Sequence, residues 1–345
     1  MSKINNIIIV SLILICSVTQ GQLENDQDIS KVGTTAAQFL KISSGGRGLA
    51  MGSANVAITN NLSSSFWNPA GLAHVKGIQV YFENNGWLAG TDYNFGSFGF
   101  EWPKVGVLSL SLTMLTTPDD LVRTIEKPTG TGEKFNAQDM SIGISLGKSL
   151  TNQLSLGATI KNIRQRIWHS TGQTIAADIG VQYKTPIKDI ILGASISNFG
   201  NDISLIGRDM NLSVDPDPNN QGNIEFVNAQ YETDAFPLPL LFRVGIGGNI
   251  INKEKLSVLF AIDAVHPNDN YEYLNIGLET NINNMFSIRA GYPGIGKKDA
   301  IEGLSLGFGV KYPIMKTSNV LVVDYTSADF GPLGIVQRVS IGFNY

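Results

Sequence analysis

The sequence predicts an all-β protein, an antiparallel outer-membrane β-barrel of about fourteen strands with a small N-terminal plug-like segment. Three observations carry this prediction. Apolar and polar residues alternate along much of the chain, the predicted strands are even in number with loops of very unequal length, and the N-terminus has the pattern of an export signal. These are the features expected of a barrel in an outer membrane.

The last segment, residues 335–345, shows the alternation most clearly. Its apolar face consists of Ile335, Val339, Ile341, Phe343 and Tyr345, and its other face carries Arg338, Ser340, Gly342 and Asn344. The same period of two recurs at residues 107–115, 154–161 and 304–312. A sheet with lipid outside and water inside requires this pattern. A soluble all-β protein would alternate too, but the glycine-rich polar positions favour strands that bend around a lumen.

The strand count gives an independent check on the barrel. Strands are predicted near residues 76–84, 91–101, 105–115, 137–147, 153–166, 172–184, 188–199, 238–250, 255–265, 271–282, 285–292, 301–312, 317–326 and 335–345. If the chain starts in the periplasm, the odd connections face outward, and these include the two longest loops, 116–136 and 200–237. Short periplasmic turns and long extracellular loops are the rule in outer-membrane barrels.

The N-terminus is predicted to be a secretory signal over residues 1–21. Lys3 precedes the apolar run 7–16, which is too short to span a bilayer, and cleavage is expected after Gly21. The only cysteine, Cys16, lies in this run, so the mature chain would contain no thiol and no disulfide. Removing Lys3 leaves 24 basic and 29 acidic residues, which gives a nucleic-acid partner no electrostatic support.

A segment of different character, residues 22–75, separates the signal from the predicted barrel at 76–345, and it is expected to be a periplasmic or plug segment. Its distinctive residues are Gly45, Arg47, Met51, Gly52, Trp67, Asn68 and Pro69. The glycines do not form a phosphate-binding loop, because no strand precedes them and no Lys-Ser/Thr pair follows. A segment this rich in small residues lets backbone approach backbone, so we expect it to pack tightly into the barrel mouth.

This segment resembles the N-terminal motif of the PorV/PorQ proteins of the type IX secretion system in Bacteroidetes-type bacteria, which are themselves similar to the FadL fatty-acid channels. The matching residues are Ala37, Phe39, Leu40, Ile42, Gly45, Arg47, Ala50, Met51, Gly52, Ala54, Ala57 and the run Trp67-Asn68-Pro69-Ala70-Gly71-Leu72. One departure is Gly45-Gly46-Arg47-Gly48, where the family commonly has Gly-Ala-Arg-Ala. The resemblance implies a Gram-negative outer-membrane location and contact with the lipid, the translocon, attachment proteins and the C-terminal signal domains of cargo.

The alternation also predicts which charges face the lumen. They are Lys161, Asp178, Arg243, Asp263, Glu279, Arg289, Lys311, Asp324 and Arg338. A Lys or Arg facing lipid at mid-membrane costs about 2–4 kcal/mol, so these side chains are expected to point inward. They could line a polar pore or form a salt-bridged network that fills the barrel, and the near balance of the two signs favours the network.

The sequence contains no pattern typical of an enzyme or of a metal or cofactor site. The three histidines, His74, His169 and His266, are far apart in the chain, and no metal-ligand spacing is present. His169 and Ser170 are adjacent, but neighbours on a strand point to opposite faces and cannot act as base and nucleophile. We therefore expect no catalysis and no cofactor.

The long loop 200–237 carries the candidate residues for binding cargo, which are Leu205, Ile206, Phe226, Tyr231 and Phe236. A loop with this many large apolar side chains either packs over its own barrel mouth or binds a partner. Two functions compete at this point. Through these loops the protein could capture secreted cargo and help deliver it to the surface attachment machinery, or it could be a FadL-like transporter of hydrophobic molecules, with glycines such as Gly245, Gly247 and Gly248 kinking a strand beside a lateral gap.

Overall fold

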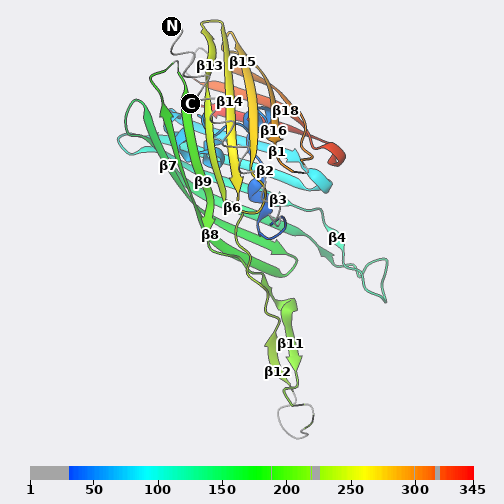
Figure 1. Ribbon diagram of the computed structural model, residues 1–345. Coiled ribbons are helices and arrows are strands. Elements are labelled where there is room, and N and C mark those ends of the chain that lie inside the picture. Colours follow the sequence, from blue (N-terminus) through cyan, green and yellow to red (C-terminus); the bar gives the residue numbers. More distant parts are fainter. Residues whose placement is uncertain (1–30, 188, 218, 220–225, 299, 315–318) are drawn as a thin grey trace.

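The computed structural model describes residues 31–187, 189–217, 219, 226–298, 300–314 and 319–345. The predicted signal, residues 1–21, lies outside the described residues. Within them the chain forms one closed barrel of antiparallel strands, with short helices inside it and two long loops at one end (Figure 1). No helix in the described part of the chain is long and apolar enough to cross a membrane.

Fourteen strands of the described residues form the barrel wall, which confirms the predicted number, and each predicted strand overlaps one of them. They are β1 (Ile78–Gly86), β2 (Asp92–Trp102), β3 (Gly106–Thr116), β6 (Ala137–Ser149), β7 (Leu154–Ile167), β8 (Ser170–Lys184), β9 (Ile191–Gly200), β13 (Leu241–Lys253), β14 (Leu256–Pro267), β15 (Tyr273–Ile282), β16 (Phe286–Ile295), β17 (Ser305–Pro313), β18 (Val320–Asp329) and β19 (Ile335–Asn344).

The long loops hold the remaining strands. The loop between β3 and β6 contains the pair β4 (Asp120–Leu121) and β5 (Lys134–Phe135), and the loop between β9 and β13 contains β10 (Ile206–Gly207) and the hairpin of β11 (Asn211–Val214) and β12 (Val227–Gln230). Three 3-10 helices lie in other parts of the loops: η3 (Leu88–Gly90), η4 (Arg208–Met210) and η5 (Gly331–Leu333). We call the end of the barrel that carries these loops the long-loop mouth, and the opposite end the short-turn mouth.

Pairing of the first strand with the last closes the barrel. β1 and β19 pair antiparallel from Gln79 opposite Asn344 to Asn84 opposite Val339. Next to them the backbone N–H of Ile78 donates to the carbonyl of Tyr345 at 3.0 Å. Gly77, with φ of +62°, precedes β1, and a Cβ there would lie 2.2 Å from the Tyr345 carbonyl oxygen. Closure leaves no unpaired edge, as a barrel in lipid requires.

The two faces of the wall differ as the alternation predicts. Along β1, exposed and buried residues alternate without a break. Outward side chains are large and apolar, for example Phe82, Leu110 and Ile160, which are 52%, 52% and 66% exposed. An apolar surface that continues around the wall is unsuited to water and matches the hydrocarbon of a bilayer.

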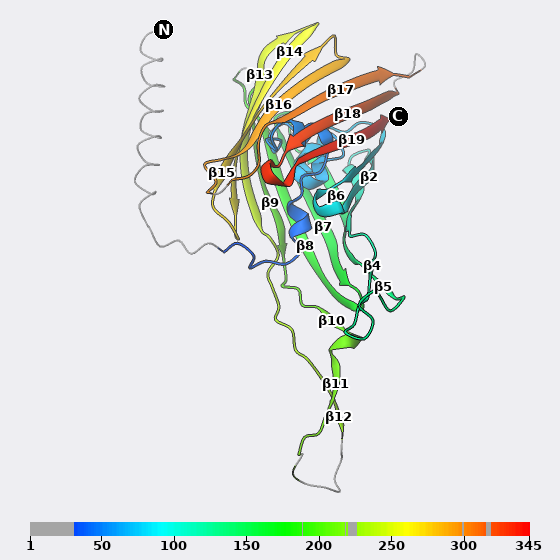
Figure 2. The same cartoon turned by 90° about the vertical axis from the view of Figure 1, so that its right-hand side faces the viewer.

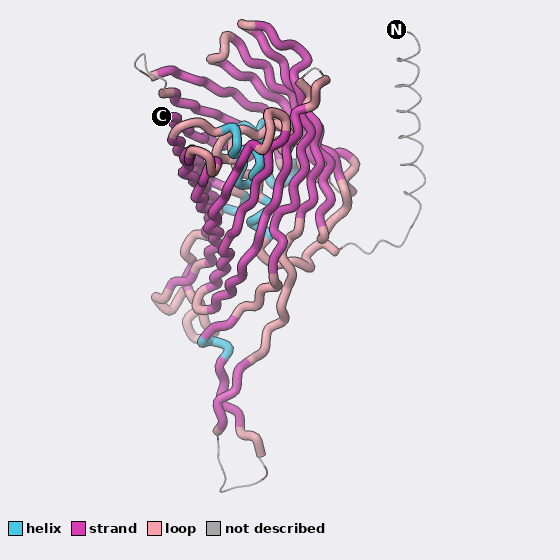
Figure 3. The backbone as a smooth tube through the Cα atoms, turned by 90° about the vertical axis from the view of Figure 1, so that its left-hand side faces the viewer, coloured by secondary structure: helices cyan, strands magenta, loops and turns pink. Residues whose placement is uncertain are grey.

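The described part of the N-terminal segment occupies the lumen. Its helices η1 (Gln38–Lys41), α2 (Gly46–Ala50), α3 (Ser64–Trp67) and η2 (Pro69–His74) lie inside the ring of strands (Figure 3). Side chains along it, such as those of Met51, Val56 and Leu72, are fully buried. We call residues 36–77 the plug.

The plug fits because the wall lacks side chains where the plug touches it. A Cβ on Gly157 of β7 would lie 2.1 Å from the carbonyl carbon of Pro69, and one on Gly291 of β16 would lie 2.0 Å from the Gly52 nitrogen. Contacts this short are possible only for glycine. The glycine-rich inward positions, expected from the sequence to serve strand bending, therefore also form the seat of the plug.

The plug runs from one mouth of the barrel to the other. Near its start, the Ala36 N–H donates to the carbonyl of Pro237 in a long loop at 2.9 Å, and its end at Gly77 lies beside Tyr345 at the short-turn mouth. The start therefore lies at the long-loop mouth (Figure 2).

Replacing Gly157 with Val should dislodge the plug. The added side chain would overlap the Pro69 backbone, and overpacking of this kind typically costs about 1–3 kcal/mol. We expect faster hydrogen exchange at residues 64–75 of a barrel that stays folded and heat-modifiable. Gly96→Val is the matched control, because a Cβ there would meet only the Phe82 side chain, at 4.0 Å. Unchanged exchange in Gly157→Val would contradict this packing.

Candidate functional site

A chain of buried charges ties the plug to the wall. Arg47 of α2 donates to both carboxylate oxygens of Glu279 on β15, at 2.8 and 3.1 Å. Glu279 also accepts from Arg289 on β16 at 2.5 Å, and Arg289 donates to Asp324 on β18 at 2.6 Å. All three wall residues were predicted to face the lumen. Each buried charge has a counter-ion, which offsets the cost of removing it from water.

A second ion pair lies where the barrel closes. Arg338 on β19 donates to Glu83 on β1 at 2.8 Å, both side chains are fully buried, and Arg338 also donates to the carbonyl of Ser43 in the plug. Glu83 in turn accepts from the Gly45 N–H at 2.5 Å. Glu83 is not among the charges that the alternation predicted to face the lumen. Glu83 stands two residues after Tyr81, and residues i and i+2 of a strand share a face. An inward Tyr81 would therefore have indicated that Glu83 also faces the lumen.

The other charges that were predicted to face the lumen each make separate contacts. Lys161 donates to Asp178 at 2.8 Å, and Asp263 accepts the plug N–H groups of Asn55 and Val56 at 2.7 and 2.9 Å. Lys311 lies on the inward side of β17, near the short-turn mouth, and is exposed. Most of the predicted charges thus hold wall strands to one another or to the plug, as the network interpretation requires.

The motif residues of the plug hold its own fold. The Asn68 side chain caps η2 by accepting from the Ala70 N–H at 3.1 Å, and it donates to the carbonyl of Val181 on β8 at 3.0 Å. The Trp67 indole N–H donates to the carbonyl of Ser44 at 2.7 Å. A Cβ on Gly48 would lie 2.7 Å from the Trp67 ring. Gly48, which stands where the PorV/PorQ motif commonly has alanine, therefore packs closely against the Trp67 ring.

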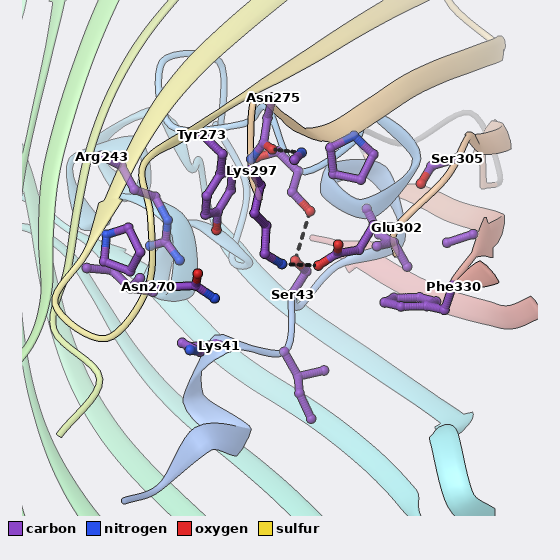
Figure 4. A pocket seen from close by; sticks show the side chains of 18 of the residues that line it. Lys41, Ser43, Arg243, Asn270, Tyr273, Asn275, Lys297, Glu302, Ser305 and Phe330 are labelled. Atoms are coloured by element: carbon purple, nitrogen blue, oxygen red, sulfur yellow. Dashed lines mark hydrogen bonds and ion pairs between the residues drawn. The ribbon is translucent and has the colours of Figure 1, made fainter. Parts of the chain in front are cut away.

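A cavity of about 240 Å³ opens at the long-loop mouth, beside the plug (Figure 4). Cations line it on the plug and on the wall, and two of them have carboxylate partners. Lys41 pairs with Asp269 at 2.9 Å, and Lys297 pairs with Glu302 at 2.7 Å. The third, Arg243 of β13, lies near the rings of Phe66 and Trp67. Aromatic and proline rings form much of the remaining surface.

Asp269, in the loop between β14 and β15, anchors the start of the plug. Burial alone would raise the pKa of this carboxyl, but the hydrogen bonds from Gln38, Thr35 and Lys41, together with the Lys41 charge, outweigh burial, so the pKa lies below its ordinary value. A depressed folded-state pKa means that the carboxylate stabilises the fold at pH above the ordinary value of about 3.9. This stabilisation is lost as the pH falls through the folded-state pKa.

Asp269→Asn should loosen the start of the plug at neutral pH. Hydrogen bonds to a charged partner contribute about 1.5–3 kcal/mol, so hydrogen exchange at residues 35–41 should quicken roughly tenfold or more. In the unsubstituted protein the same loosening should develop only below about pH 4. Lys76→Gln, which breaks the exposed pair with Glu101, is the control and should change nothing in this segment. Equal exchange in Asp269→Asn and the parent protein would rule out the anchor.

The five candidate cargo-binding residues lie on the long loop between β9 and β13. Ile206, Phe226, Tyr231 and Phe236 are 60%, 67%, 66% and 46% exposed. Leu205 and Phe236 border an open hollow of about 450 Å³ at the base of this loop. Farther out, β11 and β12 pair with each other alone and project well beyond the barrel (Figure 1, Figure 2). Leu205 is half-buried and Phe236 pairs with the buried Ile203, whereas Phe226 and Tyr231 lie farther out along the loop and are exposed.

The same loop is strongly acidic. Residues 201–240 contain seven acidic residues and one basic residue, a net charge of −6, whereas the whole chain has a net charge of −4. The projecting loop therefore combines exposed apolar side chains with a strongly acidic background.

The histidines lie apart, each with its own partner. His74 contacts Gln182, His169 contacts Asp209, and His266 contacts Glu272. The described residues contain no cluster of three or more side chains that could hold a metal ion.

Several solved structures share this architecture. The toluene transporter TbuX of Ralstonia pickettii matches with a TM-score of 0.52 and 13% identity, over 87% of this chain and 97% of that one. The monoaromatic hydrocarbon channel CymD has a TM-score of 0.52 and 11% identity, over 88% and 96%. A FadL homologue of Pseudomonas aeruginosa has a TM-score of 0.50 and 12% identity, over 88% and 98%. This chain has the FadL-like barrel fold.

At these identities the likeness concerns the fold alone. No protein-family profile matches the sequence, and no curated protein matches it. The FadL-like fold agrees with the fold that the resemblance implied.

Proposed function

We propose that this protein is an outer-membrane component of a type IX secretion system in a Bacteroidetes-like Gram-negative bacterium. In this role it binds secreted cargo through its extracellular loops and helps deliver the cargo to the surface attachment machinery. Its partners would be the translocon, the attachment proteins and the C-terminal signal domains of cargo. The observation that carries the proposal is the projecting β11–β12 hairpin with its exposed aromatic side chains.

The hairpin has the properties of an unoccupied interface. A two-stranded hairpin is marginal on its own, and β11 and β12 are each only four residues long. It nevertheless exposes Phe226, Val227 and Tyr231. Clustered aromatic residues supply most of the energy in protein interfaces, and large exposed apolar patches are uncommon without a partner. A partner that covers them would stabilise the hairpin.

The interior of the barrel supports binding over transport. Ala50, Met51, Ala54 and Val56 of the plug have no measurable exposure, so solvent does not reach between these residues and the wall. Most of the wall charges predicted to face the lumen are engaged with one another or with plug groups. Moving a solute through the barrel would require these contacts to separate.

A FadL-like transporter of hydrophobic small molecules is the second candidate, and the fold favours it. The hollow beside Ile203, Leu205, Met210 and Phe236 is largely apolar and could admit such a molecule. The glycines proposed to kink β13 do not favour it. A Cβ on Gly245 would lie 2.2 Å from an Asp263 carboxylate oxygen, and one on Gly247 would lie 2.3 Å from Ile58. Gly245 is therefore explained by close packing against the neighbouring strand β14, and Gly247 by close packing against the plug.

Replacing Phe226, Tyr231 and Phe236 with Ser should release cargo from a folded barrel. Each aromatic at the centre of an interface can contribute about 2 kcal/mol or more, so the triple change should weaken capture by well over tenfold. The measurement is the amount of cargo recovered with the native complex, alongside heat-modifiability of the barrel.

Ile125→Ser in the other long loop is the control, because Ile125 is 97% exposed but lies outside the hairpin. It should leave capture unchanged. If the triple change alters uptake of a hydrophobic ligand and leaves protein export intact, the protein is a transporter and the secretion role is wrong.

A further inference from the structure

Arg243 is a buried cation that forms no ion pair with the described residues. Its residue is 6% exposed, and among the described residues no carboxylate oxygen lies within 4.0 Å of its guanidinium. Its side-chain hydrogen bond is a long one, to the Ser197 hydroxyl at 3.4 Å. The rings of Phe66 and Trp67 lie 5.7 and 5.8 Å away and stabilise the charge in part. A buried charge normally has a counter-ion, so this one can accept an external anion.

Two further donors share the cavity with Arg243. Figure 4 shows the Tyr273 hydroxyl and the Asn270 amide directed to the same space as the guanidinium. The Asn270 side-chain oxygen already accepts from the Tyr271 N–H at 2.8 Å, which leaves its NH₂ group as a donor. Lys41 and Lys297 are neutralised by Asp269 and Glu302. Arg243 is thus the lining cation that has no ion pair among the described residues, and the carboxylate of Asp329, which accepts from the Gly331 N–H at 2.8 Å, also lines the cavity. The cavity presents this guanidinium together with convergent donors.

The rest of the lining suits a flat ring. The cavity is bordered by Trp67, Trp87, Tyr273 and Phe330, and the rings of Trp87 and Phe330 meet edge to face at 5.1 Å. At about 240 Å³ it is smaller than the roughly 300–1,000 Å³ of typical ligand pockets. One ring with its substituents fits this size better than a long chain does. The opening at the long-loop mouth would admit the ligand from that side.

We propose that this cavity binds a small organic anion, a carboxylate attached to a single ring. Arg243 holds the carboxylate, the Tyr273 hydroxyl and the Asn270 amide donate to it or to a neighbouring substituent, and the aromatic side chains pack against the ring. The carboxylate could belong to an aromatic acid or to a sugar acid. The inference does not depend on the secretion role, because none of these residues belongs to the projecting hairpin.

The test is titration of the purified full chain with two anions and their uncharged counterparts. Tryptophan fluorescence would follow benzoate against toluene, and glucuronate against glucose. We expect at least one anion to bind at least tenfold more tightly than its uncharged counterpart. Binding of benzoate alone identifies an aromatic acid, glucuronate alone identifies a sugar acid, and binding of both identifies the carboxylate as the main determinant. Equal binding of anion and counterpart in both pairs, or binding of neither anion, overturns the proposal.

Substitutions test whether Arg243 is the residue that binds the carboxylate. Arg243→Gln should weaken anion binding about tenfold or more, and Arg243→Lys should restore part of it, because a hydrogen bond to a charged group is lost and then partly replaced. Tyr273→Phe keeps the ring and should weaken binding several-fold even if Arg243→Gln fails to fold. Lys311→Gln removes a lumen cation outside the cavity and should leave binding unchanged. Full affinity in a folded Arg243→Gln, or in Tyr273→Phe if Arg243→Gln does not fold, would refute the assignment.

Discussion

The fit of the plug into the lumen is the constraint on which the rest of the structure depends. An eight-stranded barrel is filled by its own inward side chains, but a barrel of fourteen strands encloses more space than these can occupy. Residues 36–77 fill that space, and they do so through backbone contact with wall glycines such as Gly157 and Gly291. Charged wall residues complete the seat by binding Arg47 and the N–H groups of Gly45, Asn55 and Val56.

This arrangement couples the charges of the wall to the position of the plug. Removing one member of a buried ion pair typically costs about 3–5 kcal/mol, because the other charge is left unpaired. Displacement of the plug would separate Arg47 from Glu279 and Ser43 from Arg338 together. The interior therefore favours one closed state. The accessible chemistry lies at the long-loop mouth, in the cavity beside Arg243 and on the hairpin beyond it.

Local patterns in the sequence predicted the wall well, because inward and outward positions alternate within each strand. Arg289, Asp324 and Arg338 were selected on this basis, and their side chains are buried in the structure. The partners of these charges were harder to predict, since Glu83 and Arg338 are distant in the chain and meet only when the barrel closes. The route of the plug could not be read either, because no local pattern shows that Ala36 contacts Pro237 at the long-loop mouth.

The candidate sites were predicted to different degrees. Exposed apolar residues of the long loop were recognisable from composition, but their projection beyond the barrel depends on the pairing of β11 with β12 across the intervening turn. Arg243 was predicted only as one of several lumen charges. Its distinguishing feature is the lack of a described acidic partner, and this emerges only when strands, loops and plug are all in place.

The contacts between the plug and the wall leave no continuous aqueous path through the described part of the barrel. Ion conductance of the purified protein in planar lipid bilayers tests it most directly. If the plug closes the barrel, we expect no sustained current above that of the empty bilayer at moderate voltage. Stable, reproducible channel openings from the unmodified protein would show a continuous aqueous path through the barrel and would contradict the account.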